Sequence, residues 1–298
     1  MTAKEQYQAL CETEGSAIPL FLQYWWMEAV CEGKRWNVLL VHDKGGRIVA
    51  AMPYLIGSKL GLRYVLQPQL TQYSGPWYRV ESQEEELEAG KALAQQIKTL
   101  RLAYFQQNFS PQVTNWLPFY WAGYRQTTRY TYRIDDISDP QRVFEGFDPS
   151  RRQRQIRRTE GVLHPVEVTP ERFVEFHADY WARRGKRDLL TASFMLRVIG
   201  AALDRGQGLL LGLEDGDGVL QGARFVVYDD RCAYSLLSAL GEGHPNGTSA
   251  RLFFEIIKRL SGSTRAFDFE GSMDPGIGQS YRLYGARQVP YFRITKIL

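Results

Sequence analysis

The sequence has no long apolar run and only three cysteines among its 298 residues. Cys11, Cys31 and Cys232 are scattered and odd in number, which argues against a disulfide framework and favours a reducing compartment. No run of about 18 apolar residues occurs, so no membrane-spanning helix is expected. The N-terminal stretch also lacks the apolar core of a signal peptide. We therefore expect a cytoplasmic protein that does not associate with a membrane.

Metal-ligand spacing and a strong charge excess are also missing. The four histidines lie far apart along the chain, so neither a structural nor a catalytic metal is expected. The formal net charge is +4, which permits an anionic partner without requiring one. The length lies at the upper edge for a single domain and favours two.

Two segments of the chain share a hairpin pattern. "VLLVHDKGGRIVAAMPYL" begins at Val38 and "LLLGLEDGDGVLQGARFV" begins at Leu209, and a shift of about 172 positions superposes their turns. The same shift places the helical stretch from Phe21 over the one from Ser193. Chance is the alternative, because such turns are common in hairpins. The helix in the same register favours a tandem duplication.

A longer helix follows each hairpin. In the first half, Ser82 and Glu85 have the spacing of a capping box at the start of a helix. In the second half, Arg251–Leu260 carries apolar residues at helical spacing. We predict an α/β (α+β) protein with two lobes, residues 1–145 and 146–298. Each lobe is expected to hold a mixed, mostly antiparallel sheet flanked by helices.

Three stretches of the second half resemble a known family. They are "RRQRQIRRTEGV" from Arg151, "GHPNGTSARLFFEIIK" from Gly243 and "FDFEGSMDPGIGQSYRLYGA" from Phe267. With the order of the elements, they resemble the FemAB-like branch of the GNAT acyltransferase superfamily. The resemblance implies two tandem GNAT-like lobes, the second binding an acyl donor. His244 and Ser249 depart from the usual donor-loop pattern, and Tyr281-Arg282 stands where Fem-type proteins carry Phe-Lys.

The resemblance assigns donor binding to the start of the helix near Gly247. The first amides of a helix lack partners within it and favour anions such as the pyrophosphate of coenzyme A. Gly247 allows a close backbone approach, and hydroxyl groups follow it. The alternative is an ordinary N-cap formed by Asn246 or Thr248. The predicted donor-binding residues are His244, Asn246, Gly247, Thr248, Ser249 and Arg282.

The stretch "FDFE" supplies candidate proton acceptors. Strand alternation places Phe267 and Phe269 on one face and Asp268 and Glu270 on the other, facing solvent or a cleft. Glu270, and less strongly Asp268, is the candidate general base; the alternative is a surface acid or one that holds a loop. The resemblance adds Tyr281 and Tyr284 as proton donors to a leaving thiolate, where packing is the alternative.

The acceptor-binding residues are predicted from two less specific stretches. Tyr73 and Trp77 surround a Ser-Gly-Pro turn, where they either line a groove between the lobes or pack against a sheet. Arg183 and Arg184 belong to a basic, glycine-broken junction that either binds an acidic acceptor or is a solvated loop. A cluster of five arginines within residues 151–158 forms a solvated helix face, binds an acidic acceptor or touches tRNA.

These observations favour an N-acyltransferase that moves an acyl group from acyl-CoA, with acetyl-CoA as the example, to an amine. The acceptor is a small molecule or a peptide held between the lobes, and no tightly bound cofactor is expected. One alternative is a Fem-type peptidyltransferase that uses aminoacyl-tRNA. The other is a catalytically silent ligand-binding protein with the same fold. The sequence does not indicate an oligomeric state.

Overall fold

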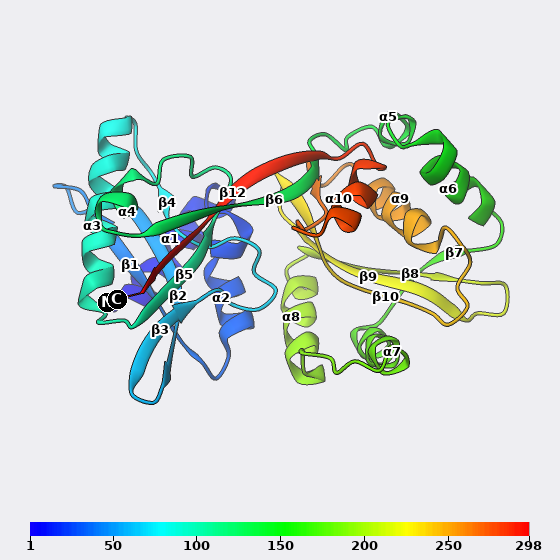
Figure 1. Cartoon of the computed structure of the whole chain (residues 1–298), viewed down its shortest axis with the longest axis horizontal. Helices are drawn as coiled ribbons and strands as arrows, with labels where there is room; N and C mark the ends of the chain where they lie inside the picture. The colour runs from blue at the N-terminus through cyan, green and yellow to red at the C-terminus, as the bar shows by residue number, and fades with distance from the viewer. Residues whose placement is uncertain (298) are drawn as a thin grey trace. The chain divides into compact units, whose positions relative to one another are not determined.

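The computed structural model describes residues 1–297, which group into two compact units (Figure 1). Unit 1 comprises residues 1–129 and the C-terminal segment from Pro290, and unit 2 comprises residues 130–289. The boundary predicted between residues 145 and 146 lies inside unit 2, directly after helix α5 (Pro140–Glu145). The chain therefore passes between the units twice, once within strand β6 (Arg125–Ile134) and once within strand β12 (Arg287–Ile297).

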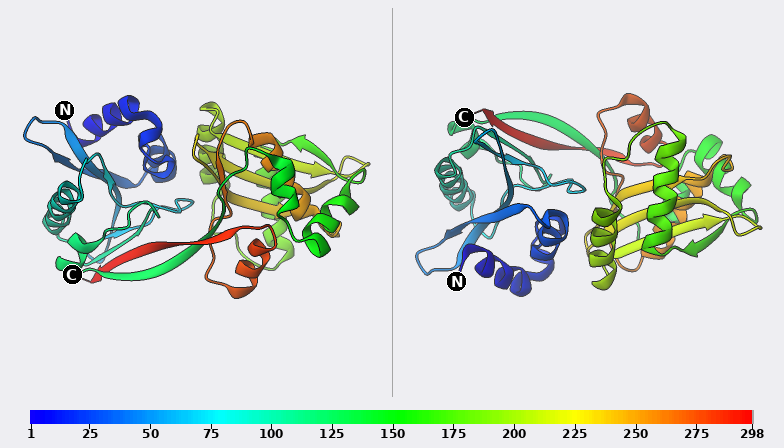
Figure 2. Two further views of the ribbon diagram at one scale, coloured as in Figure 1. Left: turned by 90° about the horizontal axis from the view of Figure 1, so that it is seen from above. Right: turned by 90° about the horizontal axis from the view of Figure 1, so that it is seen from below.

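Unit 1 is a mixed sheet with α1 and α2 on one face and α3 on the other (Figure 2). Its strands run in the order β1-β2-β3-β5-β12, and β4 adds to β2. Only β3 and β5 are parallel among these described pairs. The elements are α1 (Ala3–Glu14), η1 (Gly15–Ala17), η2 (Leu20–Leu22), α2 (Tyr24–Cys31), β1 (Arg35–His42), β2 (Ile48–Lys59), β3 (Leu62–Leu66), β4 (Trp77–Tyr78), α3 (Gln83–Thr99), β5 (Tyr104–Phe109) and α4 (Leu117–Trp121).

Unit 2 repeats this plan with additional elements at its start. Its strands run in the order β6-β11-β10-β9-β8-β7, with β10 and β11 parallel and the other pairs antiparallel. Helices α7 and α8 cover one face, and α9 and α10 lie on the other (Figure 1). The elements after α5 are η3 (Pro149–Gln153), α6 (Arg154–Thr159), β7 (His164–Glu167), α7 (Pro170–Arg183), α8 (Ala192–Asp204), β8 (Gly208–Glu214), β9 (Leu220–Tyr228), β10 (Cys232–Leu240), α9 (Thr248–Leu260), β11 (Ala266–Asp268) and α10 (Pro275–Arg282).

The two hairpins share the same register at the predicted shift of 172 positions. Leu40 pairs with Ala51 in unit 1, and Gly212 pairs with Ala223 in unit 2. Each ladder has a bulge at the same place, just before its turn. Asp43 and Asp215 then accept equivalent backbone hydrogen bonds, which close the two turns in the same way. The two hairpins thus agree in their pairing, their bulge and the hydrogen bonds of their turns. This agreement supports the duplication.

The last strand of each repeat pairs within the other unit. In unit 1, Phe105 of β5 pairs with Lys296 of β12. The equivalent position of Phe105, 162 residues further on, is Phe267 of β11, and that of Lys296, 162 residues earlier, is Ile134 of β6. Phe267 and Ile134 pair in unit 2. Each repeat therefore gives up its own terminal strand and receives the equivalent strand of the other repeat.

Local signals predicted the helices well, with one exception. Ser82 caps α3 and Thr169 caps α7, as expected from their spacing. The predicted helix from Phe21 is instead a 3-10 turn over Leu20–Leu22, followed by α2 from Tyr24. The extended backbone at Gln23 separates the two pieces.

The exchanged strand β12 supplies part of the core of unit 1, which gives a test of the exchange. Ile294 is fully buried there beside Phe105 and Tyr124. We expect Ile294→Ala to lower the free energy of unfolding of unit 1 by about 2–5 kcal/mol through loss of packing. Ile297→Ala is the matched control, because that side chain on the same strand is 86% exposed. Equal effects of the two substitutions in chemical denaturation would contradict the assignment.

Candidate functional site

Helix α9 begins without a capping side chain. Gly247 occupies the N-cap position with φ of 115°, and no side chain caps the helix within residues 1–297. Asn246 instead accepts a hydrogen bond from Gln155, and the Thr248 hydroxyl donates to the carbonyl of Pro245. The alternative in which Asn246 or Thr248 caps the helix is therefore wrong. The N–H of Thr248 already donates to the carbonyl of Pro245, so the N–H groups that follow it in the first turn are the ones suited to an anion.

The glycine at 247 is explained by packing against α6. A Cβ atom at this position would lie 2.7 Å from the carbonyl oxygen of Gln155, and the positive φ favours glycine in any case. The sequence attributed Gly247 to the close approach of a ligand. The structure shows that the backbone of α6 already makes a close approach there.

Arg152 places a positive charge beside groups of the same helix start. Its guanidinium lies 4.4 Å from the centre of the Tyr284 ring and donates to the Ser280 hydroxyl at 2.6 Å. Ser249, in the first turn of α9, lies close enough to the Tyr284 hydroxyl to lower the pKa of that phenol. We call Arg152, Ser249, Ser280 and Tyr284 the helix-start cluster. A guanidinium and a helix N-terminus both stabilise negative charge.

Strands β10 and β11 form a fork in unit 2. They pair from Cys232 with Ala266 to Tyr234 with Asp268, and β10 then continues alone on that side to Leu240. A bulge between Ser235 and Leu237 marks the same point in the pairing of β10 with β9. Among residues 1–297, the backbone groups of β10 beyond Tyr234 have no strand partner on that side.

Asp268 is a structural residue of this fork. Its side chain is 1% exposed, whereas the sequence placed it on a face toward solvent or a cleft. It accepts hydrogen bonds from the Thr131 hydroxyl and from the backbone N–H of Glu270. The Thr131 oxygen in turn accepts from the backbone N–H of Gly271. Asp268 therefore fixes the turn that presents Glu270.

Glu270 has the properties of a candidate general base. Its backbone is in the left-handed region, with φ of 56°, so the strand ends before it. Its Oε1 atom is buried and has no hydrogen-bond partner among the described residues. Burial, with a smaller contribution from Asp268, raises the pKa of the Glu270 carboxyl well above its ordinary value. A desolvated carboxylate of raised pKa is a stronger base.

Tyr281 and Tyr284 lie next to the fork, but their surroundings differ. Tyr281 is on α10 and packs on the rings of Phe269 and Tyr132. Tyr284 follows the end of α10 and is buried in the core cluster of unit 2. Burial raises the pKa of both phenols, so both stay protonated at neutral pH. Both hydroxyls can therefore serve as hydrogen-bond or proton donors.

Arg224 of β9 is a polar residue at the fork that the sequence analysis missed. Its side chain donates from Nη1 to the Ser235 hydroxyl at 2.6 Å and stacks on Phe253, 3.8 Å from the ring centre. It lies near Tyr281 and Tyr284, and their electrostatic effect is to raise its pKa. The only signal in the sequence is a single arginine in the apolar run "LQGARFVVY". Thr131 and Arg152 were also missed as site residues.

The equivalent positions in unit 1 lack these groups. Arg224 corresponds to Met52 at the shift of 172, and Glu270 and Tyr281 correspond to Asn108 and Phe119 at the shift of 162. Met52 and Phe119 are buried apolar residues. Helix α3, the counterpart of α9, is capped by Ser82 and carries three acids in its first turn: Glu84, Glu85 and Glu86. These acids disfavour an anion at that helix start.

The chain itself fills the corresponding fork of unit 1. Asn108 donates its amide to the carbonyl of Gln72 and accepts from Arg293, and its backbone carbonyl accepts from the N–H of Ser74. The side chain of Gln67 accepts from both Ser74 and Asn108. In unit 1 the segment between β3 and β4 thus takes the place that a ligand would need.

The remaining predicted residues lie apart from the fork or have structural contacts. Tyr73 and Trp77 are buried in unit 1, where Tyr73 packs on Phe21 and the Trp77 indole donates to the Ala17 carbonyl. The Arg183 guanidinium donates to the carbonyl of Leu240 at the end of β10. Three residues have other contacts in unit 2: Arg184 over the ring of Tyr180, His244 at the carbonyl of Gly241, and exposed Arg282 6.0 Å from the ring of Tyr132.

The arginine cluster divides into one inward and four outward side chains. Arg152 belongs to the helix-start cluster, as described above. The other four, Arg151, Arg154, Arg157 and Arg158, are exposed on η3 and α6. They form a basic face on the helix that packs against α9.

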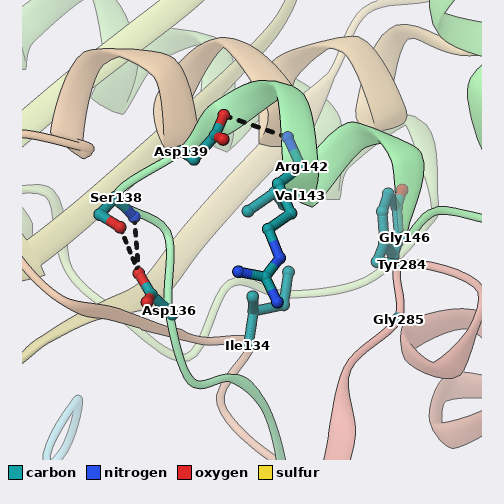
Figure 3. Close-up of a pocket in the computed structure, with 9 residues that line it drawn as sticks. All are labelled: Ile134, Asp136, Ser138, Asp139, Arg142, Val143, Gly146, Tyr284 and Gly285. Carbon is teal, nitrogen blue, oxygen red and sulfur yellow. Dashed lines mark hydrogen bonds between the residues drawn. The ribbon is translucent and has the colours of Figure 1, made fainter.

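A cavity of about 260 Å³ lies on the other side of the Tyr284 turn (Figure 3). It is bounded by the end of β6, the loop after it and α5. Its carboxylates already have partners, because Asp136 accepts from Ser138 and Asp139 caps α5 (Figure 3). The carboxylates of this cavity are therefore already hydrogen-bonded and are poor candidates for ligand binding.

Residues 1–297 contain neither a membrane-spanning helix nor a metal-binding cluster. No helix there is both long and apolar enough to cross a membrane. No group of three or more histidine, cysteine or acidic side chains is placed to hold a metal ion in the same residues.

Comparison with solved structures identifies the fold. FemX superposes with a TM-score of 0.74 at 11% identity over 98% of this chain and 96% of its own. A tandem GNAT protein from the clavulanic acid biosynthesis pathway gives 0.57 at 13% identity over 98% and 92%. L-PGS from Bacillus licheniformis gives 0.57 at 14% identity over 97% and 90%. No protein-family model and no curated protein sequence matches the chain.

These similarities confirm the predicted fold of two tandem GNAT-like halves. At such low identities they show the fold and do not transfer an activity. The functional assignment must therefore come from the groups at the fork.

The buried carboxyl of Glu270 gives a pH-dependent prediction for stability. In the unfolded chain this carboxyl ionises near its ordinary pKa, but the folded protein holds the proton to higher pH. Unfolding therefore releases a proton between these two pKa values, and raising the pH through this window destabilises the folded state. We expect Glu270→Gln to raise the melting temperature above this window and to have little effect below the ordinary pKa. A lower melting temperature for Glu270→Gln at every pH would contradict this environment.

Proposed function

We propose that this protein is an N-acyltransferase that binds acyl-CoA in unit 2 and transfers its acyl group to an amine. The single observation that carries the proposal is the difference between the repeats at equivalent positions. Among the described residues, unit 2 has an uncapped helix start and a carboxylate with one buried, unpartnered oxygen, where unit 1 has a capped helix and a hydrogen-bonded amide. Polar groups with these costs are characteristic of functional sites.

The phosphates of the donor would lie at the start of α9. The first-turn amides and the helix dipole favour an anion there, and no acid is present in that turn. Arg152 and the Ser249 hydroxyl add a positive charge and a donor from the helix-start cluster. From this point the donor's extended arm would follow β10 beyond the fork, where backbone groups lack a strand partner.

The reaction at the fork would be a direct transfer. The amine nitrogen attacks the thioester carbonyl, a carbon–nitrogen bond forms and the carbon–sulfur bond breaks. The Glu270 carboxylate takes the proton from the nitrogen, and the Tyr281 hydroxyl gives one to the leaving thiolate; exchange with solvent then restores both groups. Holding the two substrates in this geometry supplies much of the rate, because it removes the entropic cost of their encounter.

A second candidate donor, aminoacyl-tRNA, is favoured by the exposed arginines on η3 and α6. They form a basic face on elements that pack against α9, the proposed donor helix. Such a face binds a phosphate backbone with an affinity that falls steeply with salt. The two donors can be separated by binding, because only the tRNA complex would require these arginines.

Calorimetry with acetyl-CoA tests the donor site. We expect binding in the wild type and a loss of at least about tenfold in affinity for Ser249→Glu, because the new charge repels the phosphates at close range. Ser193→Glu is the matched control, since Ser193 holds the second position of α8 as Ser249 does in α9. The proposal fails if acetyl-CoA does not bind; heat with charged tRNA alone would favour the second candidate, and heat with neither a silent protein.

Turnover tests the base. We expect Glu270→Gln to lower kcat by about 10²- to 10⁴-fold while acetyl-CoA affinity is retained, because only proton removal is affected. Glu242→Gln is a control, because Glu242 is an exposed acid in the loop before α9. An unchanged kcat in an amine-acetylation assay would remove Glu270 from the mechanism.

A further inference from the structure

Arg224 is a buried cation without an anionic partner. Its side chain is 9% exposed, and it takes part in no ion pair within residues 1–297. The ionisable groups that raise its pKa are three tyrosines: Tyr180, Tyr281 and Tyr284. Burial lowers the pKa of Arg224 to about 10, so it still carries its charge at neutral pH. An uncompensated buried charge is costly to a folded protein.

Arg251, in the same unit, is a largely buried arginine that has acidic partners. Its side chain is 13% exposed and pairs with Glu255 at 2.7 Å and with Glu160 at 3.5 Å. These acids offset the desolvation of the guanidinium. The contrast with Arg224 is in the acidic partners, because the Nε atom of Arg251 is also without a hydrogen bond among the described residues.

The hydrogen bonds of Arg224 leave one edge of the guanidinium unused. Nη1 donates to Ser235, whereas the Nε atom is buried without a partner among the described residues. The edge formed by Nε and Nη2 matches a carboxylate, which accepts two parallel hydrogen bonds from it. A single positive charge among aromatic rings also suits a monoanion better than a doubly charged phosphate.

The repeat in unit 1 shows that the fold does not need an arginine here. Its equivalent residue, Met52, is buried to 1% exposure and pairs with Leu39, as Arg224 pairs with Leu211. The same hairpin position thus accepts an unbranched apolar side chain of similar length.

The position of Arg224 relates it to the proposed reacting groups. Ser235, its hydrogen-bond partner, is the first residue of β10 beyond the pairing with β11. Tyr281 lies in the electrostatic surroundings of both Arg224 and Glu270. A ligand that carries both an amine and a carboxylate would complement Glu270 and Arg224 together.

We propose that Arg224 binds the carboxylate of the acceptor, so that the acceptor is an amine of the amino-acid or peptide class. The identification of the ligand as the acceptor rests on the proposed function, but the carboxylate site itself does not. The site is formed by the edge of the Arg224 guanidinium that carries Nε and Nη2.

The carboxylate site is tested by the thermal stability of Arg224→Met in different salts. Propionate, compared with chloride at equal ionic strength, should raise the melting temperature of the wild type, because a ligand that binds only the folded state stabilises it. Arg224→Met, which places the unit 1 residue here, should melt at the same temperature or higher and should not respond to propionate. Arg251→Met is the matched control and should melt lower while keeping the response.

Several results of this experiment would overturn the proposal. The proposal is wrong if propionate does not raise the melting temperature of the wild type, or if it raises that of Arg224→Met equally. It is also wrong if Arg224→Met loses as much stability as Arg251→Met. A response to phosphate larger than that to propionate would replace the carboxylate by a phosphate. Arg224→Lys should show a weaker response than the wild type, because a lysine keeps the charge but not the two-donor edge.

The source of the carboxylate is tested with the donor bound. If the site serves the acceptor, saturating acetyl-CoA leaves the propionate response of the wild type in place. If acetyl-CoA removes it, the donor occupies Arg224 and the assignment to the acceptor is overturned. Failure of acetyl-CoA to bind would count against the proposed function alone, since the propionate response of Arg224 does not depend on it.

Discussion

Unit 2 is organised around two parallel strands that pair over three residues and then separate. Parallel strands that part leave backbone N–H and C=O groups facing one another without hydrogen bonds, and buried groups of this kind must find other partners. In unit 1 the segment from Gln67 to Ser74 provides them, through bonds to both the backbone and the side chain of Asn108. In unit 2 no equivalent segment is inserted, because β10 leads directly into the loop before α9. The same backbone geometry is a closed structural feature in one repeat and an available site in the other.

This difference accounts for the contrast between the two repeats at the positions of the fork. A duplicated fold needs only one functional copy, so the other can be optimised for packing. Unit 1 has Met52, Asn108 and Phe119 where unit 2 has Arg224, Glu270 and Tyr281. The exchange of β6 and β12 makes each unit depend on a strand from the other repeat, so a stable unit 1 also contributes to the integrity of unit 2. The polar groups of the proposed site therefore occur in unit 2, and unit 1 has apolar or hydrogen-bonded residues at the same positions.

The elements fixed by local chemistry were the ones that the sequence predicted. The turns at Asp43 and Asp215 and the caps at Ser82 and Thr169 depend on residues a few positions apart. The fork and the strand exchange depend on pairing between residues more than a hundred positions apart, such as Phe267 with Ile134, and no local pattern specifies these. The sequence predicted Glu270 as a base from strand alternation, and this stays a prediction. The same rule placed Asp268 toward solvent or a cleft, whereas Asp268 is buried and hydrogen-bonded at the turn. Arg224 was missed because an arginine in a strand normally points to solvent, whereas here Phe253 of helix α9 covers it.

Burial shifts the pKa values of the two ionisable groups at the fork in opposite directions. Burial raises the pKa of Glu270 and lowers that of Arg224, so each is displaced toward its neutral form. A direct ion pair would relieve both, yet the structure has none between them. Tyr281 lies in the electrostatic surroundings of both, and its ring is held by Phe269 and Tyr132. A ligand that carries an amine and a carboxylate could interact with both groups. The unpartnered polar atoms of Glu270 and Arg224 thus indicate a ligand that carries both an amine and a carboxylate.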